Sequence, residues 1–108
     1  MRRWFLYFII ILCNTLIAQQ TRFITGQIYD KETKEIISDA NCILIHLPDS
    51  TISGTTSDNK GHFTFNYIKD GNYILKISYI GYETTLQKIT FKSKSIDLQK
   101  IFINRIAV

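Results

Sequence analysis

Three residues in the middle of the chain have side chains that could hold a metal or carry out catalysis. Cys42, His46 and Asp49 offer a thiol, an imidazole and a carboxylate, all of which ligate zinc at about 2 Å. Cys42 and His46 fall on one face of an apolar strand-like run, where a spacing of four residues separates them by about 13 Å. The run 46–49 also lacks the helical His/Glu spacing of a zinc peptidase. We therefore expect no metal site, no cofactor, no catalytic residue and no enzyme activity.

The run 57–61 is a second candidate, because it superficially resembles a calcium-binding loop. Such a loop needs alternating oxygen ligands and a distal Glu, whereas here Lys60 lies inside the run and no Glu follows at the required distance. We interpret it as a tight turn, in which Asp58 and Asn59 cap the backbone and Gly61 takes a positive φ. His62 follows as a surface residue.

The first 18 residues have the pattern of a secretory signal peptide. Arg2 and Arg3 precede an apolar run over 4–13, and Ala18 precedes a polar stretch, so we place cleavage after Ala18. The apolar run is about half the length that a membrane-spanning helix needs. Two alternatives stay open: an uncleaved anchor, and lipidation at Cys13. The sequence therefore predicts an exported protein.

Cleavage of the predicted signal peptide would change both the net charge and the number of cysteines. Without Arg2 and Arg3, the 13 basic residues become 11 against 9 acidic ones, and they form no compact basic block. Nucleic acid is therefore not an expected partner. Cleavage would also leave Cys42 without a partner for an internal disulfide, so we interpret it as a buried hydrophobic residue.

The remaining sequence alternates between apolar and polar residues in short runs, with turn residues between them. This pattern predicts seven strands without helices, hence an all-β, seven-stranded antiparallel β-sandwich. Phe63 and Phe65 are predicted to point inward. Gly81 suggests a bulge or a close backbone approach, and the change of parity near Gln99 indicates a bulge or an early strand end. The expected strands are 23–29, 40–47, 52–57, 62–67, 73–79, 83–91 and 95–103.

An ordered set of short motifs resembles one known family. The motifs are Ile24-Thr25-Gly26-Gln27-Ile28-Tyr29-Asp30, Ala40-Asn41-Cys42-Ile43-Leu44, Asp49-Ser50-Thr51, Gly54-Thr55-Thr56-Ser57-Asp58, Gly61-His62-Phe63, Gly71-Asn72-Tyr73, Gly81-Tyr82 and Ile96-Asp97-Leu98. Together they resemble the carboxypeptidase-regulatory-like domain, a transthyretin-like or prealbumin-like sandwich. The resemblance covers 24–104, and we take the domain as 22–104. The family usually has Pro near 37–38 and before Gly71, and this chain has neither.

The resemblance implies a non-catalytic role in the cell envelope. Similar domains form the N-terminal extension of TonB-dependent outer-membrane receptors, which implies a periplasmic location, a receptor plug and barrel or another cell-envelope protein as partner, and only indirect membrane association. No barrel fits into this chain, because a barrel needs at least eight strands of about ten residues. The sequence is therefore expected to be a fragment, a truncated frame or a stand-alone module that does not itself transport nutrients.

The tyrosines leave a second function open. Exposed tyrosine rings can stack on sugars, so a carbohydrate-binding module is the alternative, with a glycan as ligand. The other interpretation of these tyrosines is packing in the core and sheets. We predict that Tyr67, Tyr79 and Tyr82 contribute to a ligand or partner surface.

Overall fold

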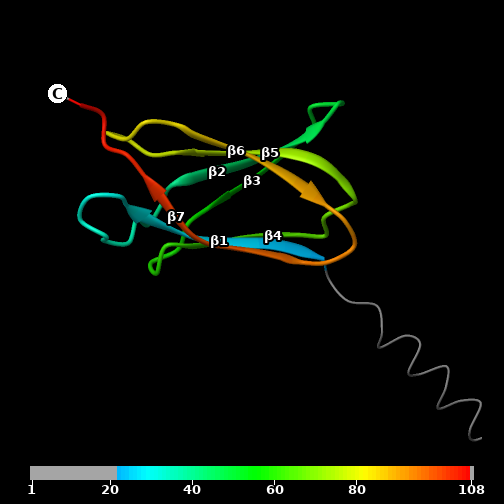
Figure 1. Ribbon diagram of the computed structural model, residues 1–108, viewed down its shortest axis with the longest axis horizontal. Coiled ribbons are helices and arrows are strands. Elements are labelled where there is room, and N and C mark those ends of the chain that lie inside the picture. Colours follow the sequence, from blue (N-terminus) through cyan, green and yellow to red (C-terminus); the bar gives the residue numbers. More distant parts are fainter. Residues whose placement is uncertain (1–21, 108) are drawn as a thin grey trace, which may run out of the picture.

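The computed structural model describes residues 22–107 (Figure 1). The predicted signal peptide 1–18, its cleavage after Ala18 and the lipidation alternative at Cys13 lie outside the described residues. In the described range, no helix is long and apolar enough to cross a membrane.

The described chain forms two facing β-sheets, which confirms the all-β sandwich (Figure 1). The three-stranded sheet has the order β4-β1-β7, and the four-stranded sheet has the order β3-β2-β5-β6. Each predicted strand corresponds to an observed one, with ends that differ by a few residues. The strands are β1 (Phe23–Asp30), β2 (Asn41–Leu47), β3 (Ile52–Thr56), β4 (His62–Asn66), β5 (Gly71–Ser78), β6 (Thr85–Phe91) and β7 (Ile96–Ile103).

One strand pair departs from the antiparallel arrangement that the sequence suggested. β1 and β7 run parallel, whereas the other four pairs are antiparallel. Parallel neighbours need a crossover connection, and here the rest of the sandwich lies between the two strands in sequence. Alternation along a single strand carries no information about the direction of its neighbour.

The core lies between the sheets and is built from alternate residues of each strand. Ile24 and Ile28 of β1 are fully buried, and Phe63 and Phe65 of β4 are 2% and 4% exposed, as predicted. Burying one large aliphatic or aromatic side chain stabilises a fold by about 1.5–3 kcal/mol, so alternation over seven strands is enough to define this core. The buried apolar residues are Ile24, Ile28, Ile37, Ala40, Cys42, Leu44, Phe63, Phe65, Ile68, Tyr73, Leu75, Ile77, Ile89, Phe91, Ile101 and Ile103.

The two irregularities that the sequence suggested have different outcomes. A bulge is present at Gln99, where β7 gains a residue relative to β1 and Gln99 takes a φ of 65°. The prediction for Gly81 was wrong, because β5 already ends at Ser78 and an added Cβ at Gly81 would meet no atom within 4 Å. Gly81 instead has a φ of 84° in a turn that the hydrogen bond from Tyr82 N–H to the Tyr79 carbonyl closes. Only glycine takes that φ at little cost.

Candidate functional site

An acidic side chain is buried at the end of β1. Asp30 has the same parity as Ile24 and Ile28, so the alternation of the strand turns its carboxylate inward, and the residue is 1% exposed. Oδ1 accepts hydrogen bonds from the backbone N–H groups of Glu32, at 2.8 Å, and Thr33, at 3.0 Å. A buried carboxylate is tolerated only when it is hydrogen-bonded and paired. Asp30 therefore organises the turn that follows β1.

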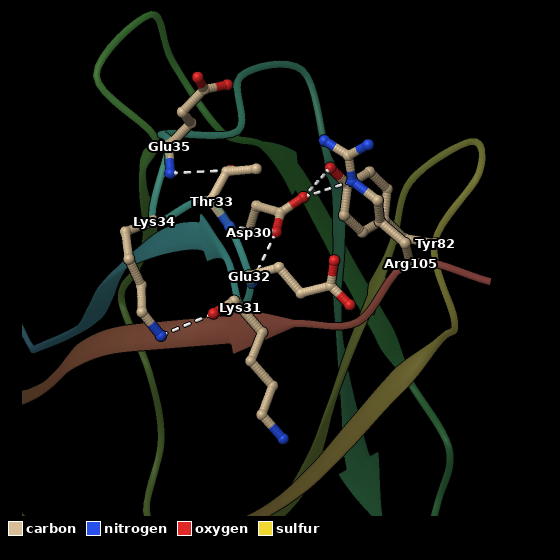
Figure 2. A network of polar contacts seen from close by, with 8 residues as sticks. All are labelled: Asp30, Lys31, Glu32, Thr33, Lys34, Glu35, Tyr82 and Arg105. Atoms are coloured by element: carbon tan, nitrogen blue, oxygen red, sulfur yellow. Dashed lines mark hydrogen bonds and ion pairs between the residues drawn. The ribbon is translucent and has the colours of Figure 1, made fainter. Parts of the chain in front are cut away.

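The other oxygen of this carboxylate binds two side chains from distant parts of the sequence. Tyr82 donates its hydroxyl to Asp30 Oδ2 at 2.5 Å, and Arg105 donates Nε–H to the same oxygen at 2.7 Å (Figure 2). The Arg105 guanidinium also lies over the Tyr82 ring, 5.8 Å from its centroid. Three segments therefore meet at one oxygen: the end of β1, the turn after β5 and the residues after β7.

The network holds Asp30 in its charged form. The Tyr82 hydroxyl and then the Arg105 guanidinium, with the backbone N–H of Thr33, hold the pKa of Asp30 well below its usual range. The same contact raises the pKa of Tyr82, because ionisation of its hydroxyl would remove the donor to Asp30. A carboxylate fixed in this way has no proton to donate at neutral pH, and its lowered pKa makes it a weak proton acceptor, so it is a poor general acid and a poor general base. The arrangement binds segments together and does not resemble an acid–base site.

Backbone pairing completes the attachment of the C-terminal segment. Arg105 forms an antiparallel bridge with Tyr82. Glu83 N–H donates to the Asn104 carbonyl at 2.8 Å, and Ile106 N–H donates to the Gly81 carbonyl at 3.0 Å. The turn after β5 and the C-terminus lie at the same end of the sandwich (Figure 1). We call residues 104–106 with this turn the anchored exit, because these bonds hold the last strand-like segment of the described chain against the turn.

The sequence indicated Asp30 only as part of a family motif and gave Arg105 no role. The signal that would have identified Asp30 is its parity with Ile24 and Ile28, which places a charge at an inward position. No pattern in the sequence signals Arg105, because its partner is 75 residues away.

The three predicted surface tyrosines do not form one surface. Tyr67 precedes β5 and is 83% exposed, whereas Tyr79 and Tyr82 follow β5 and are half-buried. An eight-residue strand separates them by about 26 Å. The rings of Tyr79 and Tyr82 pack together, with centroids 5.7 Å apart. Tyr67 and the Tyr79–Tyr82 pair are therefore separate features at opposite ends of the sandwich.

Tyr67 borders a groove of about 330 Å³. His46 and Asp49, both considered as chemical groups in the sequence, lie in its wall, where His46 Nδ1 is 2.8 Å from Asp49 Oδ1. The ring of Tyr73 packs on His46, and its hydroxyl donates a hydrogen bond to the Lys69 carbonyl. Tyr73 is only 7% exposed. Among the tyrosines of residues 22–107, only Tyr67 is exposed. The groove thus has one ring available for stacking.

Cys42, the remaining candidate, is fully buried, as predicted. Burial raises the pKa of its thiol to about 12, which keeps it protonated at neutral pH. In residues 22–107, no group of three or more His, Cys, Asp and Glu side chains is arranged to hold a metal ion.

Comparisons with known proteins identify the domain type. The family model described as the CarboxypepD_reg-like domain matches residues 24–104. No protein with a curated description matches the sequence.

Several solved structures share the fold at low sequence identity. The chain aligns with the shaft pilin SpaA from Lactobacillus rhamnosus GG at a TM-score of 0.62 and 17% identity, over 83% of this chain and 49% of the pilin. It aligns with the group B streptococcus pilus 2b backbone protein at a TM-score of 0.59 and 18% identity, over 78% of this chain and 41% of that protein. The Bacillus anthracis TIE protein gives a TM-score of 0.65 at 13% identity, over 80% of this chain and 17% of that protein. The chain thus spans less than half the length of these structures, and the likeness concerns the fold.

Proposed function

Because the chain belongs to the CarboxypepD_reg-like domain family, we propose that it is a non-catalytic accessory domain of a TonB-dependent outer-membrane receptor. In this proposal the domain is periplasmic and makes protein–protein contacts during nutrient uptake. Its partners are the plug and barrel of the receptor or another protein of the cell envelope.

The anchored exit is the observation that carries this proposal. A domain joined to a larger body through a flexible linker takes its orientation independently of that body. Here Arg105 is paired with the buried Asp30, and the backbone of Ile106 is bonded to Gly81. Residues 104–106 therefore have a fixed position on the sandwich, which suits a domain that must present a surface to a neighbour in the same polypeptide.

The state of the reactive side chains supports a non-catalytic role. Asp30 accepts four hydrogen bonds and has a lowered pKa, so it has no proton to donate to a substrate and little tendency to accept one. The Cys42 thiol is buried and protonated at neutral pH, which makes it a poor nucleophile.

Two experiments test the proposal. The DNA after the codon for Val108 is expected to encode a plug and barrel in frame, or a degraded remnant of them. The chain with its own leader and a C-terminal tag is expected in the periplasmic fraction of a Gram-negative host. An authentic stop codon with no barrel remnant, together with a cytoplasmic location, would contradict the proposal.

The carbohydrate-binding alternative has weaker support. A module that stacks on glycans is expected to present two or more exposed tyrosine rings on a concave surface. The groove beside Tyr67 offers one exposed ring, because Tyr73 is buried. We therefore keep the protein-contact function as the proposal.

A further inference from the structure

The outer face of the four-stranded sheet is unusually apolar for a surface that faces solvent. In an antiparallel sandwich, alternate residues point to the core, and the others are expected to be polar. Here six outward positions over all four strands carry aliphatic side chains. They are Ile43, Ile45 and Leu47 of β2, Ile52 of β3, Ile74 of β5 and Leu86 of β6. We call these six residues the aliphatic stripe.

The strand register shows that the stripe is continuous across the sheet. Ile45 lies between Ile52 on one side and Ile74 on the other, which forms one row. Two residues along the strands, Ile43 and Leu86 belong to the neighbouring row. Ile52 is 67% exposed and Leu86 is 65% exposed, while the isoleucines between them are half-buried. The edges of the stripe therefore stand out into solvent.

The charged residues on this face are lysines. Lys76 lies between Ile43 and Leu86 in the second row, and Lys88 is the cross-strand neighbour of Ile74 in the first row. Among the outward positions of these four strands, none carries a carboxylate. Two copies of the chain packed through this face would therefore bring lysines together without any acidic partner. The surface is complementary to apolar groups flanked by carboxylates.

A hollow interrupts the sheet face beside the stripe. It has a volume of about 480 Å³, and Ile43, Gly54, Thr56, Lys76 and Ser78 are among its lining residues. It is open because Gly54 has no side chain and an added Cβ there would meet no atom within 4 Å. A side chain from a partner can therefore enter above Gly54, beside Ile43.

The dimensions suit a helix. Four strands at about 4.8 Å spacing span about 14 Å, which matches about three turns of an α-helix, and two rows of side chains match the width of its apolar face. Sheets with an uncovered apolar face are commonly covered by helices.

We propose that the aliphatic stripe, with Lys76 and Lys88, binds an amphipathic α-helix of a partner protein whose apolar residues are flanked by Asp or Glu. The opposite face of the sandwich provides the contrast, since its surface hollow is lined by polar residues such as Thr25, Gln27, His62, Thr64, Asp97 and Lys100. The stripe and the anchored exit are distinct surfaces, so binding of a helix can be tested whether or not a receptor follows the domain.

The probe is a fluorescent 16-residue helical peptide with Leu at positions i, i+3, i+4 and i+7 and Glu beside them. We expect this peptide to bind the chain without residues 1–18 in a fluorescence anisotropy titration and to shift the NMR signals of the aliphatic stripe. A peptide with Lys in place of Glu is expected to bind about tenfold more weakly. Each exposed charge pair changes the affinity by less than tenfold, so this difference requires the loss of more than one pair. Affinity for the Glu peptide is expected to fall with added salt.

Variants separate the two parts of the surface. The double change Lys76→Glu with Lys88→Glu, and the double change Ile52→Ser with Leu86→Ser, are each expected to weaken binding about tenfold. These four side chains lie on the solvent side of the sheet, so the fold is expected to persist. The control is Lys100→Glu with Phe102→Ser on β7, which makes one charge reversal and one apolar-to-polar change on the other sheet and is expected to leave affinity within about twofold.

Three results would overturn the proposal. The first is the absence of binding by the Glu peptide, or NMR shifts confined to the three-stranded sheet. The second is binding to phosphatidylglycerol vesicles through Lys76 and Lys88 without binding of the peptide, which would identify a membrane surface instead. The third is a dimer in sedimentation analysis that Ile52→Ser with Leu86→Ser dissociates, which would identify a second copy as the occupant.

Discussion

Replacement of Ser57 by Ala tests the packing of the loop between β3 and β4. Ser57 is 1% exposed, and its hydroxyl joins two backbone groups of the segment that leads into β2. Oγ accepts from Ala40 N–H at 2.9 Å and donates to the Ile37 carbonyl at 2.9 Å. The backbone of Ser57 also pairs with this segment, since Ser57 N–H donates to the Ala40 carbonyl and Asp39 N–H donates to the Ser57 carbonyl. Ser57 therefore joins the connection between β3 and β4 to the connection between β1 and β2.

The expected cost follows from the two backbone groups that lose their partner. An unpaired buried N–H or carbonyl costs about 1–3 kcal/mol. Ala40 is 0% exposed and Ile37 is 6% exposed, so water does not readily replace the hydroxyl at either group. We expect Ser57→Ala to lower the free energy of unfolding by about 2–6 kcal/mol, out of a total of about 5–15 kcal/mol for a domain of this kind. The midpoint of thermal unfolding should fall by at least about 8 °C.

Urea unfolding of the chain without residues 1–18, followed by circular dichroism, measures this change. Ser53→Ala on β3 is the matched control, because Ser53 is exposed, and it should change the free energy of unfolding by less than about 0.5 kcal/mol. Ser57→Cys separates volume from hydrogen bonding, because a thiol fills the space but is a weak donor, so it should cost nearly as much as Ala. If Ser57→Ala unfolds within about 0.5 kcal/mol of the unchanged chain, the reasoning from buried backbone groups is refuted.

Four further predictions address the network at Asp30 and the core. Because Tyr82 and Arg105 hold the pKa of Asp30 below its usual range, its contribution to stability is complete above about pH 4 and is lost as the pH falls further. Asp30→Asn should therefore flatten the loss of stability in urea titrations between pH 4 and 2, and an unchanged pH profile would contradict this. Arg105→Ala should speed hydrogen exchange of the amide in residue 106 at least tenfold, since that amide belongs to the anchored exit, whereas Lys100→Ala should leave it unchanged. Cys42, with a thiol pKa raised to about 12 by burial, should react with a disulfide reagent at pH 8 only as fast as the domain unfolds; rapid labelling of the native chain would show an exposed thiol. Gly26→Ala places a Cβ 2.7 Å from Phe63 Cζ and should cost about 1–3 kcal/mol in urea unfolding, and the cost should shrink in a Phe63→Leu background.

The strands could be predicted from the sequence because local alternation and turn residues define them. Phe63 and Phe65 alternate with polar residues, and both are buried as expected. The bulge at Gln99 was also visible, because Ile96 and Leu98 change parity relative to Ile101 and Ile103. The role of Gly81 could not be predicted, because the sequence does not distinguish a glycine that takes a positive φ in a turn from a glycine within a strand.

The candidate sites were less predictable, because each depends on contacts between distant residues. Tyr82 was predicted to contribute to a ligand or partner surface, and only the tertiary structure shows that its hydroxyl is bonded to Asp30. Tyr67 and Tyr79 look equivalent in sequence, but a whole strand separates them. The aliphatic stripe also cannot be recognised from any single strand, because two or three aliphatic residues at alternate positions are common in strands. Only the pairing of the strands places these residues beside one another.

The sequence by itself determined the class of this domain and most of its strands, since the alternation of side chains has a period of two and needs no information beyond each segment. It also determined the family, through an ordered set of turn and strand motifs over 24–104. The tertiary structure alone decided that β1 runs parallel to β7, that Arg105 reaches Asp30, and that lysines and isoleucines share one face of the larger sheet. The physical reason is that pairing partners and ion pairs are set by the packing of whole sheets, which no local pattern encodes.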